Sequence, residues 1–266
     1  MTTGISADLI LFHVFKVCAS AFAHSDAILC RKIVAEGSWP SSWKLHWIFP
    51  LHKRKSRAEP SNYRGIHLTA QLSKVCERVL AEHLLPFWCA TESFGRNQYA
   101  YTPKRGYRDA LAVLTFSWVW ALGSGKRIGV YCSDVAGAFD RVSAERLISK
   151  LRSSGVHSNL LGVLSSWLDG RSAQVCVDGA KSTLFILKDQ VFQGAVLGPP
   201  LWNIFCADAA LCTDCLGFTT IVFADDLNCF QVPDATATDA CILRGLTIVR
   251  NSARLGKRQS GCVRGQ

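Results

Sequence analysis

The stretch TTIVFADDLNCF (Thr219–Phe230) places two adjacent aspartates, Asp225 and Asp226, between two short apolar runs. Both runs are strand-like, so the pattern predicts a β-hairpin with the acids at or beside its turn. Successive side chains of a strand point to opposite faces, but a turn lets both carboxylates reach one pocket. Aspartate also favours ordinary turns, so the hairpin by itself leaves a functional and a purely structural interpretation open.

A third aspartate, Asp134, ends another short apolar run, RIGVYCSD (Arg127–Asp134), which predicts a further strand. If this strand lies beside the hairpin, three carboxylates converge at one edge of a sheet. Such a cluster is strongly unfavourable without a cation, and hard oxygen ligands select Mg²⁺ or Mn²⁺. Two such ions, about 3.5–4 Å apart, can clamp the attacking and leaving oxygens of a displacement at phosphorus.

Hydrophobic periodicity and turn signals divide the rest of the chain into interleaved helices and strands. Strands are expected over residues 43–49, ended by Pro50, and on both sides of the turn pair Asp178-Gly179. Helices are expected over residues 7–36, 72–86, 108–122, 143–155, 158–169 and 198–211. The order has no regular βαβ rhythm, which favours the α+β class.

The composition is that of a globular chain, with 266 residues, 49% hydrophobic and 19% charged. This length can bury a sizeable core in one large domain or two subdomains. The net charge of +10 is uneven, because residues 44–108 carry 12 Lys or Arg against 4 Asp or Glu, whereas residues 128–230 carry 7 against 10. A basic lobe beside an acidic one suggests a polyanion held near a metal site, although scattered surface charge is the default explanation.

Cysteines and apolar segments give little sign of zinc or membrane binding. Of the 12 cysteines, only Cys212 and Cys215 have the CxxC spacing, and a structural zinc site needs four ligands. Asp8 and His13 interrupt the N-terminal apolar run, and no stretch approaches the roughly 20 apolar residues of a membrane span. We therefore expect an intracellular protein, nuclear or cytoplasmic, with no membrane partner.

Three segments follow one another along the chain in this order: YCSDVAGAFDRV (Tyr131–Val142), QGAVLGPPLWNIF (Gln193–Phe205) and FADD (Phe223–Asp226). They resemble the three core palm motifs of reverse transcriptases, and those of the non-LTR retrotransposon class most closely. FADD is weak evidence when taken singly, whereas ordered segments together are strong evidence.

Upstream segments extend the resemblance over roughly residues 35–255. WKLHWIFPLHK (Trp43–Lys53) and NYRGIHLTAQLSKVCERVL (Asn62–Leu80) resemble the fingers region of that class. NQYAYTPKRGYRDAL (Asn97–Leu111) is similar to the segment that usually precedes the first palm motif.

The resemblance implies an α+β, right-hand polymerase fold, with an antiparallel palm sheet packed on helices. The expected parts are an N-terminal helical extension (1–34), fingers (35–125) and palm (126–240). Residues 241–266 would be a truncated or degenerate start of the thumb region, so we expect the thumb to be absent or truncated.

The resemblance also implies roles for individual residues. Asp134, Asp225 and Asp226 would be the catalytic triad that binds two Mg²⁺ or Mn²⁺ ions, with the Val135 backbone carbonyl as a further ligand.

Five other residues match substrate-binding positions of the family. Phe139 would stack under the incoming sugar and exclude a 2′-hydroxyl, and Gln193-Gly194 would touch the template and the incoming nucleotide. Arg64 and Lys53 match basic residues that hold the triphosphate, a task that suits the fixed paired donors of arginine.

The implied function is that of a retroelement RNA-directed DNA polymerase domain, which joins a dNTP to the 3′-hydroxyl of a DNA primer on an RNA template. Gly65 and Phe223 depart mildly from the family pattern, and residues 244–266 match it only faintly. The alternatives are a catalytically inactive relic that only binds nucleic acid, and a maturase-like reverse transcriptase of an intron.

Overall fold

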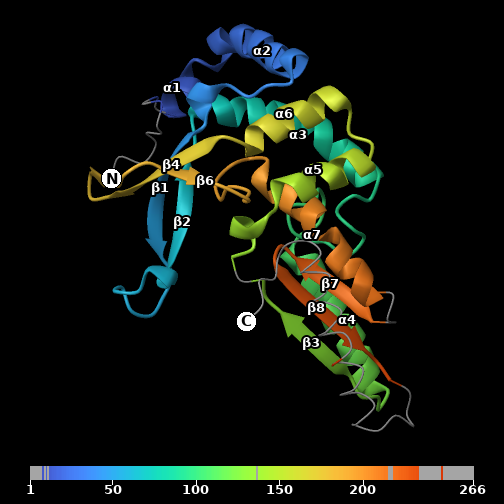
Figure 1. Ribbon diagram of the computed structural model, residues 1–266. Helices are drawn as coiled ribbons and strands as arrows, with labels where there is room; N and C mark the ends of the chain where they lie inside the picture. The colour runs from blue at the N-terminus through green and yellow to red at the C-terminus, as the bar shows by residue number, and fades with distance from the viewer. Residues whose placement is uncertain are drawn as a thin grey trace. The chain divides into compact units, whose positions relative to one another are not determined.

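A computed structural model of the chain describes residues 12–135, 137–214 and 218–233, together with Asp8, Ile10 and Thr247. The described residues form two compact units (Figure 1). The first unit joins the described part of Met1–Leu85 to Leu147–Gly198. The second joins Pro86–Arg146 to the described part of Pro199–Gln266.

The first unit contains a mixed five-stranded sheet in the order β2-β1-β4-β5, with β6 also paired to β4. β1 (Leu45–His52) runs antiparallel to β2 (Tyr63–Leu68) and parallel to β4 (Arg171–Val177). β5 (Ala180–Lys181) and β6 (Phe185–Leu187) both run antiparallel to β4, and β4 and β5 form the hairpin expected from the sequence.

The prediction that the first strand ends at Pro50 was wrong, because β1 continues to His52 and Pro50 pairs with Gly65 of β2. The parallel neighbour β4 pairs with β1 only over Leu45–Ile48. Pro50 therefore lies where β1 has a partner on one side only, the kind of edge position at which a strand tolerates proline.

The helices fall where the apolar periodicity predicted them, with one correction. α3 (Gln71–Ala90) continues through Pro86, where the sequence predicted its end. A proline inside a helix costs about 3 kcal/mol. The turn beyond it buries Trp88 completely, and burial of a large aromatic side chain can offset that cost.

The remaining helices agree with the predicted segments, whereas the short turns were not predicted and one of them contains Trp43, which the sequence placed in the first strand. The helices are α1 (Phe12–Val17), α2 (Ala19–Glu36), α4 (Tyr107–Gly123), α5 (Ala144–Ser153), α6 (Ser158–Leu168) and α7 (Gly198–Asp214). The 3₁₀ turns are η1 (Ser41–Trp43), η2 (Pro60–Asn62) and η3 (Phe139–Arg141). Within the described ranges, no helix is both long and apolar enough for a membrane crossing.

The second unit contains an antiparallel sheet in the order β3-β8-β7. Its strands are β3 (Gly129–Ser133), β7 (Thr219–Phe223) and β8 (Asp226–Gln231). Residues alternate between the two faces, as a period of two requires. Ile221 and Phe230 pack with residues of α4, whereas Val222, Leu227 and Cys229 pack with Ala209 and Ala210 of α7. The sheet is thus covered on both faces by helices, and its exposed end carries the acids predicted from the sequence.

Candidate functional site

The three predicted acids lie at the same end of the β3-β8-β7 sheet. Asp134 follows the last residue of β3, Asp225 lies in the β7–β8 turn, and Asp226 opens β8. The last registered pair between β3 and β8 is Ser133 with Leu227, so Asp134 and Asp226 stand one step beyond it. Asp134 and Asp226 are exposed and Asp225 is half-buried. β3 therefore lies beside the β7–β8 hairpin, which was the condition for the three carboxylates to converge.

The turn before the acids is strained. Ala224 and Asp225 form a two-residue connection, because Phe223 pairs with Asp226. Ala224 has φ +56°, a left-handed value that an L-residue with a side chain rarely adopts. A positive φ at only the first turn position is the pattern of a type II′ turn, which normally places glycine there. Contacts around Ala224 must therefore stabilise it.

Those contacts come from two buried side chains, Gln98 and Trp202. The Oε1 atom of Gln98 accepts hydrogen bonds from the backbone N–H groups of Ala224 (3.0 Å) and Ala100 (3.0 Å). Its Nε2 donates to the Ala224 carbonyl (3.4 Å), which also accepts from the Trp202 indole Nε1 (3.1 Å). Sequence reasoning missed Gln98, because nothing local to residues 97–100 signals a contact 126 positions away.

Phe139, the predicted sugar-contacting residue, belongs to η3 of the second unit. Its side chain is 9% exposed, and its ring stacks on Trp202 with centroids 5.8 Å apart and an interplanar angle of 18°. Phe139 is thus joined through Trp202 to the Ala224 carbonyl, and it shares a compact unit with all three acids.

The donor chemistry at the sheet end fits a hard divalent cation. Three carboxylates, and the Val135 backbone carbonyl next to Asp134, are the oxygen ligands that Mg²⁺ and Mn²⁺ prefer. Among the residues that the structure describes, no three His, Cys, Asp or Glu side chains are gathered tightly enough to form a metal site. The Cys212–Cys215 pair, weighed above for zinc, lies outside the described side chains.

The other predicted site residues belong to the first unit. Lys53 directly follows β1, and its N–H donates to the Asn62 carbonyl (2.9 Å), which closes the β1–β2 connection. Arg64 lies in β2 opposite Leu51. Both cationic side chains are exposed, at the same end of the β1–β2 pair.

The Gln193-Gly194 loop is held against β2. The Gln193 carbonyl accepts from the His67 N–H (2.8 Å), and Gly194 has φ +103°. A Cβ atom added to Gly194 would lie 2.6 Å from the His67 carbonyl oxygen, so no other residue fits without movement. The Oε1 atom of Gln193 is buried and has no hydrogen-bond partner among the residues that the structure describes, which is unusual unless a ligand supplies one.

Glu77 anchors the same loop from α3. Its side chain is fully buried, and Oε2 accepts from the N–H groups of Val196 (2.7 Å) and Leu197 (3.3 Å), while Oε1 accepts from Ser73 Oγ (2.9 Å). Hydrogen bonds to a carboxylate are stronger than neutral ones. Sequence reasoning missed this residue, because a glutamate on an amphipathic helix normally marks the solvated face.

A buried chain of polar side chains supports His67. Arg171 is fully buried, and its NH1 group donates to His46 Nε2 (2.6 Å). His46 Nδ1 lies 3.0 Å from His67 Nδ1. Since His46 Nε2 must accept, we assign its proton to Nδ1, which donates to a deprotonated His67 Nδ1. Both imidazoles are then neutral.

Burial and the Arg171 charge explain why both histidines stay neutral. Desolvation, then the Arg171 guanidinium, lower the pKa of His46 to about 2 and that of His67 to about 4. Burial lowers the pKa of Arg171 to about 10, which keeps it charged, and the Glu77 carboxylate opposes that shift.

Acid is expected to destabilise the protein through these two histidines. Below about pH 6.5 the unfolded chain binds protons that buried His46 and His67 cannot accept, so stability falls as pH falls. The free energy of unfolding should drop by up to about 1.4 kcal/mol per pH unit for each histidine between pH 6.5 and 4.5. Urea unfolding across this range measures the slope.

The control for this prediction is a histidine outside the buried chain. His67→Gln should flatten the pH dependence, whereas His83→Gln, at an exposed position on α3, should leave it unchanged. Equal slopes in the wild type and the His67→Gln variant would contradict the assignment of acid sensitivity to this pair.

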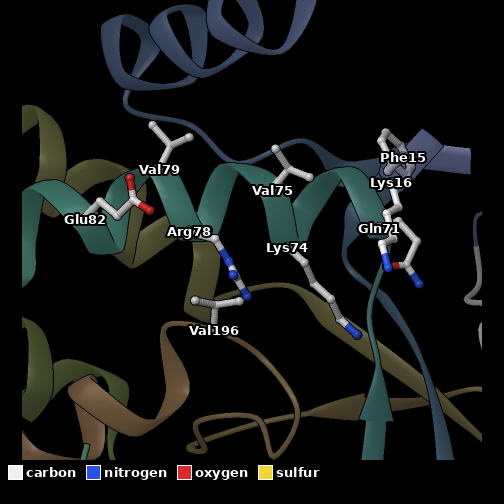
Figure 2. A pocket seen from close by; sticks show the side chains of 9 residues that line it. All are labelled: Phe15, Lys16, Gln71, Lys74, Val75, Arg78, Val79, Glu82 and Val196. Carbon is white, nitrogen blue, oxygen red and sulfur yellow. The ribbon is translucent and has the colours of Figure 1, made fainter. Parts of the chain in front are cut away.

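A pocket of about 400 Å³ lies between α1 and α3 of the first unit (Figure 2). Three cations line it: Lys16, Lys74 and Arg78. Arg78 extends from α3 toward Val196, which follows the Gln193-Gly194 loop, and Lys74 leaves α3 on the same side. None of the three forms an ion pair with a described residue, and burial, as the largest cause, lowers the pKa of Lys74. Glu82 is the one carboxylate in the lining, so the pocket offers a net positive charge beside that loop.

One solved structure has a fold similar to that of this chain. The structure is similar to an apo telomerase from Candida tropicalis, truncated from its C-terminal domain, with a TM-score of 0.57. The match covers 90% of this chain and 53% of the telomerase chain, at 12% identity. At this identity the likeness concerns the fold only, and it defines a polymerase fold of mixed α and β content.

The family follows from sequence. Residues 51–252 match the model of the family described as reverse transcriptase (RNA-dependent DNA polymerase), and the chain belongs to that family. It is 30% identical over 183 residues to the probable RNA-directed DNA polymerase from transposon BS of Drosophila melanogaster. It is 29% identical over 184 residues to the RNA-directed DNA polymerase from mobile element jockey of the same species.

A third relative is the Pol polyprotein from type-1 retrotransposable element R1 of Bradysia coprophila, 27% identical over 203 residues. These three matches cover 68%, 68% and 74% of this chain, but only 20%, 20% and 19% of the relatives. The chain thus spans about a fifth of their length. The predicted membership of the non-LTR reverse transcriptases is confirmed.

Proposed function

We propose that this chain catalyses RNA-directed DNA synthesis, in which a DNA primer 3′-hydroxyl attacks the α-phosphorus of a dNTP opposite an RNA template. The observation that carries the proposal is the placement of Asp134, Asp225 and Asp226 at one end of one antiparallel sheet. In this proposal residues 35–125 act as fingers and 126–240 as palm. These functional divisions differ from the two compact units, because Leu147–Gly198 belongs to the first unit.

Asp134, Asp225 and Asp226, with the Val135 carbonyl, would hold two Mg²⁺ or Mn²⁺ ions. Bound there, the ions supply positive charge that favours deprotonation of the primer hydroxyl and neutralises the triphosphate. The chain itself sets the spacing of the carboxylates through the register of β3, β8 and β7.

The remaining site residues would orient the substrates. Arg64 and Lys53 contact phosphate oxygens of the dNTP, and the Phe139 ring disfavours a ribose 2′-hydroxyl. Gln193 and Gly194 contact the template and the incoming nucleotide. The buried Oε1 of Gln193, which no described residue contacts through a hydrogen bond, supports this role, because an amide oxygen can accept from a base or sugar donor.

The template backbone would pass the pocket on α3. Lys16, Lys74 and Arg78 supply positive charge without ion-pair partners among the described residues, next to the loop proposed to contact the template (Figure 2). Phosphate contacts of this kind carry no sequence information and release counterions.

Removing two of these cations is expected to weaken binding of single-stranded RNA and to reduce its salt dependence. The double variant Lys74→Gln, Arg78→Gln should lower the slope of log affinity against log salt by about 0.7 for each phosphate that is no longer neutralised. Fluorescence anisotropy with labelled RNA, over a salt titration, measures the slope.

Lys32→Gln is the matched control, because Lys32 lies on α2 and pairs with Glu36 at 3.7 Å. It removes one exposed charge outside the pocket and should leave the slope unchanged. An unchanged slope in the double variant would remove the pocket from the template path.

Primer extension tests the proposed function. The protein should extend a DNA primer annealed to RNA when dNTPs and Mg²⁺ or Mn²⁺ are present. A folded protein that binds the duplex but never extends it would contradict the proposal and favour the nucleic-acid-binding relic.

A further inference from the structure

A short segment of chain extends the acid-bearing sheet beyond β7. The Tyr99 N–H donates to the Val222 carbonyl (2.9 Å), and the Val222 N–H donates to the Asn97 carbonyl (2.9 Å). Gln98 thereby forms a parallel bridge with Val222. The segment stops pairing through its backbone at the point where the β7–β8 turn begins.

Beyond that point the Gln98 side chain takes over the pairing. Its amide accepts from the Ala224 N–H (3.0 Å) and donates to the Ala224 carbonyl (3.4 Å), as a neighbouring strand would. Gln98 is 3% exposed and Ala224 is 9% exposed, so water cannot easily replace these bonds. Ala224 is the left-handed residue directly before Asp225.

We propose that Gln98 is a positioning residue for the reaction, whose amide holds Ala224 in its left-handed conformation and thereby aims Asp225 and Asp226. This inference rests on the proposed function of the two acids. A strained backbone persists only where its surroundings determine it, and here the surroundings are one amide and the Trp202 indole. Without the amide, Ala224 relaxes toward negative φ and rotates the peptide that carries Asp225.

The chemistry of the contact requires a primary amide. Ala224 presents one donor and one acceptor, and a primary amide offers both kinds of group in one plane. A carboxylate at position 98 lacks the donor, and a thioether lacks the donor and is a weak acceptor. Gln98→Met therefore removes the clamp while keeping a side chain of similar length.

The rival explanation is that Gln98 only fixes its own segment, since its Oε1 also accepts from the Ala100 N–H (3.0 Å). Asn203→Leu supplies the matched control. Asn203 is fully buried on α7, and its Nδ2 donates to the Ala100 carbonyl (2.8 Å), so it fixes the same segment through a hydrogen bond that does not involve Ala224.

Primer extension distinguishes the two explanations. Gln98→Met should lower incorporation by about ten- to a hundredfold, because misplacing a reacting group by about 1 Å has this effect. It should also raise the half-saturating Mn²⁺ concentration. Asn203→Leu should change incorporation less than about threefold, because we expect it to lower the stability of the protein slightly and to leave the acids in place. Equal losses in both variants would overturn the proposal.

A second-site substitution tests the strain directly. In the Gln98→Met background, Ala224→Gly should recover about tenfold in incorporation, because glycine adopts positive φ without the steric cost that alanine meets. Gln98→Met should correspondingly have a smaller effect in the presence of Ala224→Gly than in the wild type. Absence of this rescue would overturn the clamp.

Two readouts do not depend on turnover. Hydrogen exchange of a peptide covering 219–230 should accelerate in Gln98→Met and not in Asn203→Leu. Mn²⁺ binding to the protein–duplex complex, followed by electron paramagnetic resonance, should weaken in Gln98→Met. If the wild type fails to extend primers, the proposed function fails, while unchanged hydrogen exchange in Gln98→Met is the separate result that refutes the clamp.

Discussion

Asp225→Asn is expected to lower nucleotide incorporation by about a thousandfold or more, while the protein still binds primer–template duplex. Asparagine keeps the size and turn preference of aspartate but removes the negative charge that a divalent ion needs. The half-buried place of Asp225, directly after the strained Ala224, gives its carboxylate a fixed direction that a free loop would not. Single-turnover primer extension and a filter-binding assay measure the two quantities separately.

Asp178→Asn is the matched control for that variant. Asp178 also occupies a two-residue hairpin turn, between β4 and β5 of the first unit, with φ +49°. Asparagine tolerates this conformation as well as aspartate does, so incorporation should stay near the wild-type rate. Substantial incorporation by Asp225→Asn would refute the assignment of Asp225 as a metal ligand.

Gly194→Ala should also impair the reaction strongly. The added Cβ would lie 2.6 Å from the His67 carbonyl, at φ +103°, so the loop must move away from β2 or break the hydrogen bond between His67 and Gln193. We expect the KM for dNTP to rise about tenfold or more, and stability to fall by roughly 1–3 kcal/mol. Steady-state extension and urea unfolding check both.

Gly123→Ala provides the comparison, since Gly123 ends α4 and an added Cβ would meet nothing within 4 Å. Alanine is the better helix former, so this variant should be as stable as the wild type or up to about 1 kcal/mol more stable. A normal KM in Gly194→Ala would show that the loop does not position the nucleotide.

Local pattern was sufficient for much of the fold. Alternation and turn residues predicted the β7–β8 hairpin and the Asp178-Gly179 turn, and helical periodicity predicted α4 and α6 within a residue or two. These elements depend on neighbours in sequence, where propensity and periodicity act. The two errors, at Pro50 and Pro86, arose because a missing strand neighbour and the burial of Trp88 compensate for the proline.

The residues of the candidate site also fall into those that the sequence could predict and those that it could not. The acids could be found from the sequence, because paired carboxylates between apolar runs are conspicuous. Gln98, Glu77 and Arg171 could not, since each acts on backbone or side chains more than a hundred positions away. A buried amide, carboxylate or guanidinium has no local signature, and only the packed chain reveals what it contacts.

The Arg171–His46–His67 chain limits how such a sequence can drift. Loss of Arg171 would leave His46 Nε2 buried without its present donor, and loss of His46 would remove one of the acceptors of the buried guanidinium, so each single change costs more than a joint replacement by apolar residues. Among diverging relatives of this chain, these three positions should therefore be inherited or exchanged as a set. Sequences in which only one of these positions has changed should be rare.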